Sequence, residues 1–294
     1  MKTQLIKKLR EVTGAGIVDC KLALQESNFD IEKALEYLRK KGVAAARKRH
    51  GRDTSEGLIA LQIQENKGAL VALYSETDFV ARNATFQNLA KNLASLALDN
   101  FTDLESFSKT PYPSSQSTVA EEIANNISTT GENIALKQVT VLSVGQGAIL
   151  HYVHSPIAAN LGKIGVLVAL ESAAPKTQLQ ELGKNLAMQI AATKPDALSI
   201  ETLDKRKIEK ERDIIAEQVR RLNKPDNISA KMIEGRLKKY FADAVLLEQA
   251  CIADNKITVR ELIAATEKQL GESIRIAGYR MLILGEHNAL YTHG

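Results

Sequence analysis

The first fifty residues carry apolar side chains at the three- and four-residue spacing of amphipathic helices. The pattern predicts three short helices, over Thr3 to Val12, Ile17 to Glu26 and Asp30 to Lys41. Gly14 and Gly16 lie between the first two and relieve the backbone at a tight corner. The apolar positions that can close a small core are Leu5, Leu9, Leu22, Ala34, Leu35 and Leu38. Because so small a bundle is only marginally stable alone, we interpret it as a docking module.

From Gly57 onward the periodicity changes to that of strands. Alternating residues from Ile59 to Ile63 and the apolar run Leu70 to Tyr74 predict two strands, and a helix over Phe86 to Leu98 follows. The same order returns in the segments Ala148 to His154, Ile164 to Leu170 and Gln178 to Ala192. The pattern therefore predicts an α+β fold whose core is a duplicated unit of antiparallel sheet plus helix.

Residues 201–247 interrupt the second unit with two long helical patterns. Ile208, Ile215, Val219 and Leu222 recur at helical spacing, a turn around Pro225 stops the helix, and a second apolar series resumes at Ile233. This pattern predicts an inserted antiparallel coiled-coil hairpin. A helix over Val259 to Leu270 and a strand over Ile274 to Leu284 then complete the second unit.

These patterns divide the chain into regions of different character. The predicted regions are a three-helix docking head (1–52), the first half of the core (53–146), the second half (147–200 and 256–285), the coiled-coil insertion (201–255) and a tail (286–294).

The composition favours a cytoplasmic protein. No run of about 18 apolar residues is present, and the first residues lack the apolar stretch of a signal peptide, so we expect no membrane association. Cys20 and Cys251 are far apart and have no metal-type spacing, so we expect both thiols to be reduced and half-buried.

The net charge of +4 is modest, and the basic residues are clustered. The run Arg47 to Arg52 has almost no aromatic residue that could stack on a base, so we interpret it as a solvated linker. The same argument makes Lys205-Arg206-Lys207 a solvated helix face. Nucleic-acid binding is therefore not expected.

The sequence offers little that indicates covalent chemistry. It has no Gly-rich phosphate loop after a strand and no Gly-x-Ser-x-Gly motif. His151 and His154 are three apart in a predicted strand and point to opposite faces, which disfavours a shared metal. We therefore expect no enzyme, no catalytic residue, no metal site and no cofactor.

The segment Tyr74 to Asn83 sets an acid beside an aromatic ring where a strand gives way to a polar turn. Thr77 or Asp78 can cap the helix that carries Phe86. Taken alone, Phe79 is best explained as a hydrophobic staple packed on its own helix. The alternative is an exposed anchor that enters a partner.

The wider motifs favour the anchor. The block Thr77 to Asn83 and the N-terminal block Leu9 to Lys21, with its Thr-Gly-Ala-Gly turn, closely resemble bacterial elongation factor Ts. Gly131 to Ile134, Gly165 to Val168 and Lys231 to Arg236 follow in the order of that family. The resemblance implies a nucleotide exchange factor for elongation factor Tu and a head with a ubiquitin-associated-like fold.

The resemblance also implies which residues bind the partner. Thr77, Asp78, Phe79 and Val80 would form a tip that enters the G domain, where Asp78 and Phe79 disturb the magnesium site. The residues implied for the head are Arg10, Ile17, Val18 and Lys21, and the residue implied for the second half, against the partner's second barrel, is His154.

One alternative from another class is a scaffold or RNA-binding protein that uses the helical head and basic linker, with a purely structural Asp-Phe tip. The sequence leaves open whether two copies pair through the coiled coil.

Overall fold

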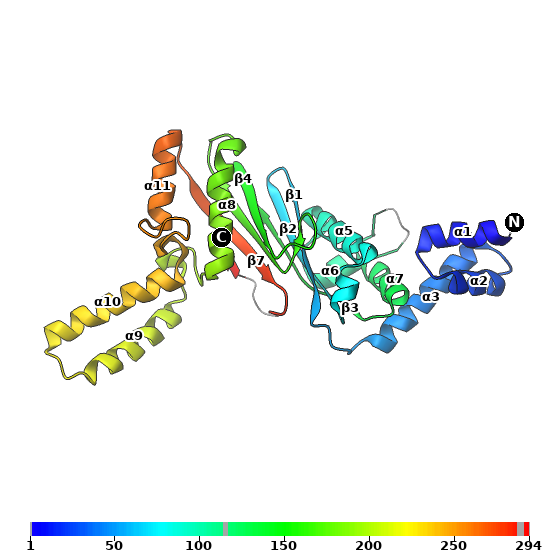
Figure 1. Ribbon diagram of the computed structural model, residues 1–294, viewed down its shortest axis with the longest axis horizontal. Helices are drawn as coiled ribbons and strands as arrows, with labels where there is room; N and C mark the ends of the chain where they lie inside the picture. Colours follow the sequence, from blue (N-terminus) through cyan, green and yellow to red (C-terminus); the bar gives the residue numbers. More distant parts are fainter. Residues whose placement is uncertain (1, 114–116, 287–290, 294) are drawn as a thin grey trace.

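The computed structural model describes residues 2–113, 117–286 and 291–293. It is an elongated α+β molecule with three helices at one end, a helical hairpin at the other and two antiparallel sheets between them (Figure 1). The α-helices are α1 (Lys2–Thr13), α2 (Ile17–Glu26), α3 (Ile31–Arg49), α4 (Asp78–Ala81), α5 (Ala84–Asn100), α6 (Leu104–Lys109), α7 (Val119–Thr130), α8 (Lys176–Thr193), α9 (Lys205–Arg220), α10 (Asp226–Ala244) and α11 (Val259–Leu270). The strands are β1 (Glu56–Gln64), β2 (Lys67–Ser75), β3 (Ile134–Ser143), β4 (Gly147–His154), β5 (Leu161–Gly162), β6 (Ile164–Glu171), β7 (Arg275–Ile283) and β8 (Tyr291–His293).

The N-terminal helices enclose a small core of their own. The buried residues of this core are Leu9, Cys20, Ala23, Leu24, Ala34 and Leu38. Gly14 has a φ of +66°, a conformation that glycine adopts without strain, and this permits the sharp turn from α1 into α2. The prediction that Leu22 belongs to this core is wrong, because its side chain is 37% exposed.

Helix α3 does not end at Lys41 as predicted but continues to Arg49. The first half of the predicted solvated linker, Arg47 to Arg49, is therefore helical. The last turn of α3 consists of Arg47, Lys48 and Arg49. Their positive charge interacts favourably with the free carbonyl groups at the end of the helix. Tertiary contact extends the helix, since Ala46 packs against the core of the first sheet.

The second half of α3 lies against α7, so the head is joined to the body by a packed interface. A side chain at Gly42 would place its Cβ 3.0 Å from Asn125 Oδ1, which shows how closely the two helices approach. Arg39 and Glu121 form an ion pair across the same contact. The orientation of the head is therefore set by this helix pair.

Three strands of each sheet repeat one topology. The orders of the two sheets are β3-β2-β1-β5 and β4-β6-β7-β8, so in each sheet the second strand of a hairpin lies between the first strand and a strand that returns later. Irregularities in register also correspond, between Ala72 and Leu73 in β2 and between Ala169 and Leu170 in β6. The strand and helix order predicted for both halves is therefore present.

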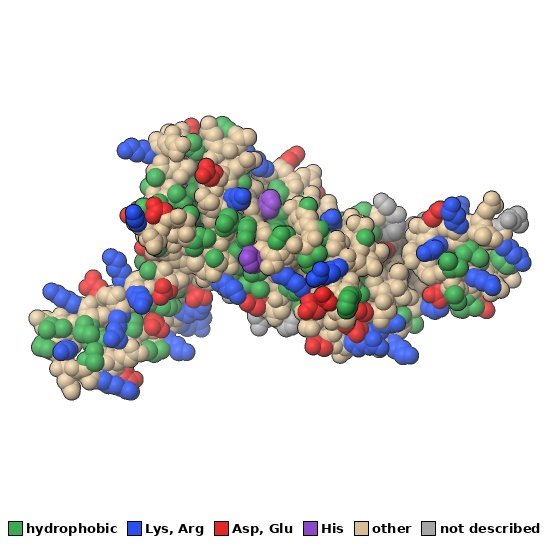
Figure 2. All heavy atoms as spheres, in the orientation of Figure 1, with side chains coloured by type: hydrophobic (Ala, Val, Ile, Leu, Met, Phe, Trp, Pro, Cys, Tyr) green, Lys and Arg blue, Asp and Glu red, His purple; other side chains and the backbone are tan. Residues whose placement is uncertain are grey.

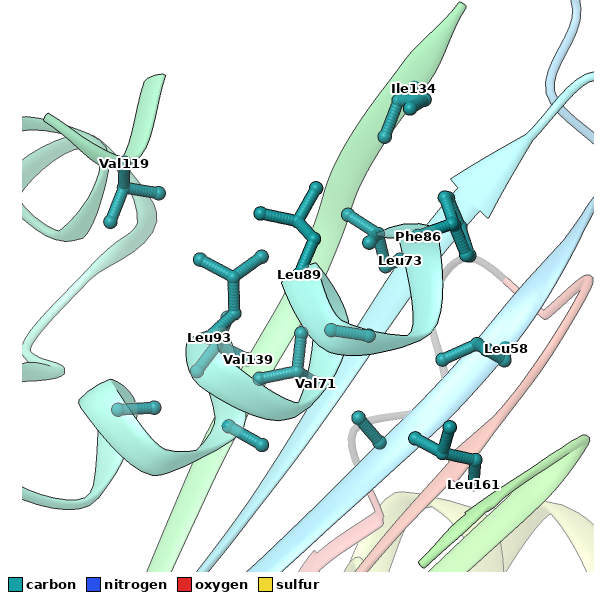
Figure 3. Close-up of a cluster of buried hydrophobic side chains, with 14 of the residues drawn as sticks. Leu58, Val71, Leu73, Phe86, Leu89, Leu93, Val119, Ile134, Val139 and Leu161 are labelled. Carbon is teal, nitrogen blue, oxygen red and sulfur yellow. The ribbon is translucent and has the colours of Figure 1, made fainter. Parts of the chain in front are cut away.

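Each sheet has one face toward the other sheet and one face covered by helices. The residues of the shared layer include Ile59, Leu61, Leu70, Ala72, Tyr74, Leu142, Ile149, Leu167, Ala169 and Leu282. Alternate residues of the same strands, such as Leu58 and Val71, point away and pack under Phe86 and Leu93 of α5 (Figure 3). Helix α8 covers β4 and β6 in the same way.

Two strands depart from the predicted division of the chain. Strand β5 follows β4 in sequence but pairs with β1 of the first sheet, through Leu161 opposite Ala60. Strand β8 pairs with β7, so part of the predicted tail from 286 to 294 is a sheet edge. Residues 287–290 and 294 of that tail lie outside the described residues.

Helices α9 and α10 form a hairpin that projects from the body (Figure 1). Ile215, Val219 and Leu237 are buried between them. At the base, Ala197, Leu203 and Val245 form a second small cluster. Apolar side chains at the outer end are exposed among Lys and Arg side chains (Figure 2), and they include Leu222 and Ile228, which are 45% and 44% exposed.

Candidate functional site

The segment after β2 forms a short projecting tip. Strand β2 ends at Ser75, and the single helical turn α4 begins at Asp78. The side chain of Phe79 is 81% exposed, whereas Val80 is only 8% exposed and belongs to the core of the first sheet. The structure thus divides the predicted tip residues into a presented aromatic ring and a buried neighbour that holds α4 to the body.

The exposure of Phe79 contradicts the staple interpretation, because a staple would pack the ring against its own helix. The predicted cap is also wrong, since α5 begins at Ala84 and its cap is Asn83, whose side chain accepts a hydrogen bond from the Thr85 N–H at 2.8 Å. The ring of Phe79 is therefore open to solvent and accessible to a partner.

A carboxylate from another element holds the backbone before Phe79. Thr77 donates two hydrogen bonds to Glu132, from its N–H at 3.0 Å and from its hydroxyl at 2.6 Å. The Ser75 hydroxyl donates to the Thr77 carbonyl at 2.9 Å. Sequence reasoning missed Glu132 because it is 55 residues away from Thr77, and no local pattern signals such a contact.

Asp78 lies at the start of α4 and has one charged neighbour. Its carboxylate is 3.5 Å from Arg82 Nε, one helical turn further on. Both side chains are about half or more exposed, so the pair is weak and the carboxylate stays accessible. An accessible acid thus stands beside an accessible aromatic ring.

The head presents a second surface that is partly apolar. The four residues predicted there, Arg10, Ile17, Val18 and Lys21, are all exposed. Ile17 and Val18 are 56% and 78% exposed at the start of α2. The head thus presents two adjacent apolar side chains together with the basic side chains of Arg10 and Lys21 on its exposed surface.

Two further apolar residues of the head are exposed and were not predicted as part of this surface. Val12 is the next-to-last residue of α1 and is 67% exposed, and Leu22 lies one turn after Val18 in α2. The signal in the sequence was that Val18 and Leu22 share one helix face. Asp19 accepts a hydrogen bond from Lys41 at 2.6 Å, which raises the pKa of the lysine and ties α2 to α3.

The residue predicted for the third surface, in the second half of the core, is His154. It ends strand β4 and is exposed. Its Nδ1 is 3.1 Å from the Tyr152 hydroxyl. Beside it, Tyr152, His151, Asn160 and Lys184 contribute to an open pocket of about 510 Å³.

The described residues contain no group of three His, Cys, Asp or Glu side chains that could hold a metal ion. Both thiols are buried, and burial raises the pKa of Cys20 and of Cys251, which makes each a poor nucleophile. In the part of the chain that the structure covers, no helix combines the length and the apolar character needed to cross a bilayer.

The three predicted surfaces lie on different elements: α1 and α2 for the head, α4 for the tip and β4 for His154. Exposed apolar side chains at separate places on an elongated molecule are suited to contact with a large partner. These features favour a protein that acts by binding another protein.

Comparison with known proteins identifies the family. A family model described as elongation factor TS matches residues 76–286. The elongation factor Ts of Rhodospirillum centenum is 46% identical over 282 residues, which cover 96% of this chain and 92% of that protein. The corresponding protein of Ehrlichia canis is 48% identical over 282 residues, covering 96% and 98%. That of Bartonella quintana is 45% identical over 281 residues, covering 96% and 92%.

The chain belongs to the elongation factor Ts family. Members of this family are nucleotide exchange factors for elongation factor Tu in translation elongation, and they act without making or breaking a covalent bond.

Proposed function

We propose that the tip at Asp78 and Phe79 is the part of this exchange factor that drives GDP release from elongation factor Tu. The observation that carries the proposal is the 81% exposure of Phe79 on a helical turn whose other side is buried. An exposed ring on a rigid mount can fill an apolar pocket of a partner at little cost in conformational entropy.

The mechanism follows from how a G domain holds its nucleotide. GDP is bound largely through phosphate contacts and Mg²⁺, so a wedge that displaces these elements removes much of the affinity. In this proposal Phe79 fills the pocket, the carboxylate of Asp78 disturbs the magnesium and phosphate site, and Thr77 and Val80 hold α4 in place. Because linkage is reciprocal, bound GDP weakens binding of the factor by the same ratio.

The head would supply binding energy rather than the exchange step. Arg10, Ile17, Val18 and Lys21 are exposed together on α1 and α2, and Val12 and Leu22 add apolar area to that surface. In this proposal the head is a ubiquitin-associated-like docking module within residues 1–52, and His154 contacts a second domain of the partner.

The proposal is tested by the release of a fluorescent GDP analogue from elongation factor Tu of the same organism. Catalytic amounts of the protein should accelerate release, and excess GDP should dissociate the complex. A variant in which Ile17 and Val18 are both changed to Asp should raise the KM for the complex and keep its kcat. Unchanged release with the wild-type protein would overturn the proposal.

We also propose that α9 and α10 are a short coiled coil through which two copies associate. The buried seam of Ile215, Val219 and Leu237 supports a coiled coil, and the exposed apolar residues Ile214, Leu222 and Ile228 supply unpaired surface. A second copy would bury these apolar side chains of the hairpin and would leave α4, on the first sheet, accessible.

Replacing residues 209–239 by a short Gly-Ser linker tests this role. The base cluster at Ala197 and Val245 is retained, so the body should stay folded. Sedimentation should show loss of self-association, while exchange should remain partly active. A monomeric wild-type protein would rule out pairing, and complete loss of exchange in the folded variant would mean that the hairpin contacts elongation factor Tu.

RNA binding is the weaker alternative. Arg49, which lies inside the basic run and ends α3, donates a hydrogen bond through Nε to the Gly131 carbonyl at 2.8 Å, so part of the run has a structural partner. Binding to RNA through Lys and Arg would fall steeply with salt, whereas binding through the apolar tip would not. The salt dependence of complex formation separates the two.

A further inference from the structure

The turn Gly131-Glu132-Asn133, between α7 and β3, lies directly beside the tip. Ser75 at the end of β2 pairs with Ile134 at the start of β3, so residues 76–78 and residues 131–133 leave the sheet side by side. Neighbouring strand ends hold the two loops at the spacing of a sheet, which brings their side chains within hydrogen-bonding reach.

Glu132 is the residue of this turn that holds the start of α4. Both oxygens of its carboxylate accept hydrogen bonds from Thr77, at 3.0 Å from the N–H and 2.6 Å from the hydroxyl. Thr77 is the residue before α4, but its side chain makes no capping bond to that helix. The bonds to Glu132 are charge-assisted and therefore stronger than bonds between neutral groups.

The turn is itself held by three hydrogen bonds to other segments. The Asn133 N–H donates to the Glu76 carboxylate at 2.6 Å, and the Asn133 side chain donates to the Arg52 carbonyl at 3.0 Å. Arg49 at the end of α3 donates to the Gly131 carbonyl. Glu132 thus stands on a rigid support that is also connected to the head.

A four-residue helix has little stability of its own, because forming the first turn is the unfavourable step of helix formation. Val80 holds one side of α4 to the core, but the start of α4 depends on the bonds from Thr77. Without these bonds, Asp78 and Phe79 would sample more orientations, and each binding event would have to order them. We propose that Glu132 is a positioning residue for nucleotide exchange, which acts through Thr77 to hold Asp78 and Phe79 in the orientation that enters the G domain. This inference rests on the proposed function of the tip.

The test measures stimulated GDP release with the full-length protein and four variants, Phe79→Ala, Glu132→Ala, Glu132→Gln and Thr77→Val. Glu132→Ala should lower the kcat of exchange about tenfold, equivalent to about 1.4 kcal/mol, and change the KM less than twofold because the head still binds. Glu132→Gln can still accept from the Thr77 N–H and should recover most of the rate. Thr77→Val removes only the hydrogen bond from the hydroxyl, so its exchange rate should lie between the rates of Glu132→Ala and Glu132→Gln.

The double variant of Phe79→Ala and Glu132→Ala separates positioning from a general structural role. If Glu132 acts through the ring, Glu132→Ala should have little further effect once Phe79 is absent. Glu171→Ala is the matched control, since it removes a half-exposed acid paired with Arg275 in the second sheet, and exchange should be unchanged.

Three outcomes would overturn the inference. Multiplicative effects in the double variant would mean that Glu132 does not act through the Phe79 ring. Wild-type exchange in folded Glu132→Ala, with slow exchange in Phe79→Ala, would refute the brace while the tip stands. Normal exchange in Phe79→Ala would refute the proposed tip, and the inference with it.

Discussion

Phe79 and Val80 are adjacent apolar residues with opposite surroundings. One is exposed and the other buried, because a single helical turn lying on the sheet must send successive side chains in different directions. Val80 contributes to the core, so its replacement should affect folding. Phe79 contributes nothing comparable to the folded chain, so its replacement should affect only the complex.

We predict that Phe79→Ala will slow stimulated GDP release about 30-fold, since the loss of an interfacial aromatic anchor costs about 2 kcal/mol. The free energy of unfolding should change by less than about 0.5 kcal/mol, as expected for an exposed site. Stopped-flow fluorescence and urea unfolding measure the two quantities. Ile252→Ala, at an apolar residue that is 51% exposed, is the control. Reduced stability with normal exchange would restore the staple interpretation.

At the scale of elements, the contact between α3 and α7 determines how the head is held. Arg39 of α3 pairs with Glu121 of α7. Glu121 also completes the capping box of α7, in which its carboxylate accepts from the Thr118 N–H. One acid therefore stabilises both the start of α7 and its contact with the head.

This contact should weaken in acid. Burial raises the pKa of Glu121, but the bonds from Arg39 and Thr118 outweigh burial and keep the pKa below its ordinary value of 4.5. The folded chain therefore binds this proton more weakly than the unfolded chain. The stabilisation is complete above about pH 4.5 and is lost as the pH falls through the lower pKa of the folded state.

We predict that Arg39→Ala will raise the pKa of Glu121 toward 4.5 and flatten the fall in unfolding free energy below that pH. An NMR titration of the carboxyl group and urea unfolding between pH 3 and 7 would measure both effects, with the pH range chosen about the usual glutamate pKa. Arg206→Ala, which removes an almost fully exposed arginine, should leave the titration unchanged. An unaltered pKa in Arg39→Ala would show that the ion pair does not stabilise the carboxylate.

At the scale of the whole molecule, the close approach of the two sheets fixes how the two halves of the core are arranged. A Cβ added at Gly165 in β6 would lie 2.8 Å from Ile59 Cγ2 and 2.9 Å from Leu70 Cδ2 of the other sheet. Glycine at this position therefore lets the sheets share one apolar layer. The tip belongs to the first sheet and His154 to the second, so this layer fixes the relation between the two surfaces.

We predict that Gly165→Ala will lower the free energy of unfolding by about 1–3 kcal/mol, the usual cost of overpacking a core. Gly145→Ala is the matched control, because nothing lies within 4 Å of a Cβ at that position. Thermal and urea unfolding would measure the difference. Equal stability of the two variants would contradict the shared apolar layer.

The sequence alone determined the local elements of this protein. The bounds of α2 and α11 agree with prediction, and the order of strands and helices in both halves is present, because hydrophobic periodicity reports which face of a single element is buried. The block around Asp78 and Phe79 was also recognisable, since its residues are contiguous.

Only the tertiary structure decided the rest. The extension of α3 along α7, the pairing of β5 with the first sheet and the face-to-face sheets depend on which surfaces meet. The contact between Thr77 and Glu132 joins residues 55 apart, and the exposure of Phe79 depends on which side of α4 lies against the first sheet. Such contacts form between elements, so the hydrophobic periodicity within one element does not predict them.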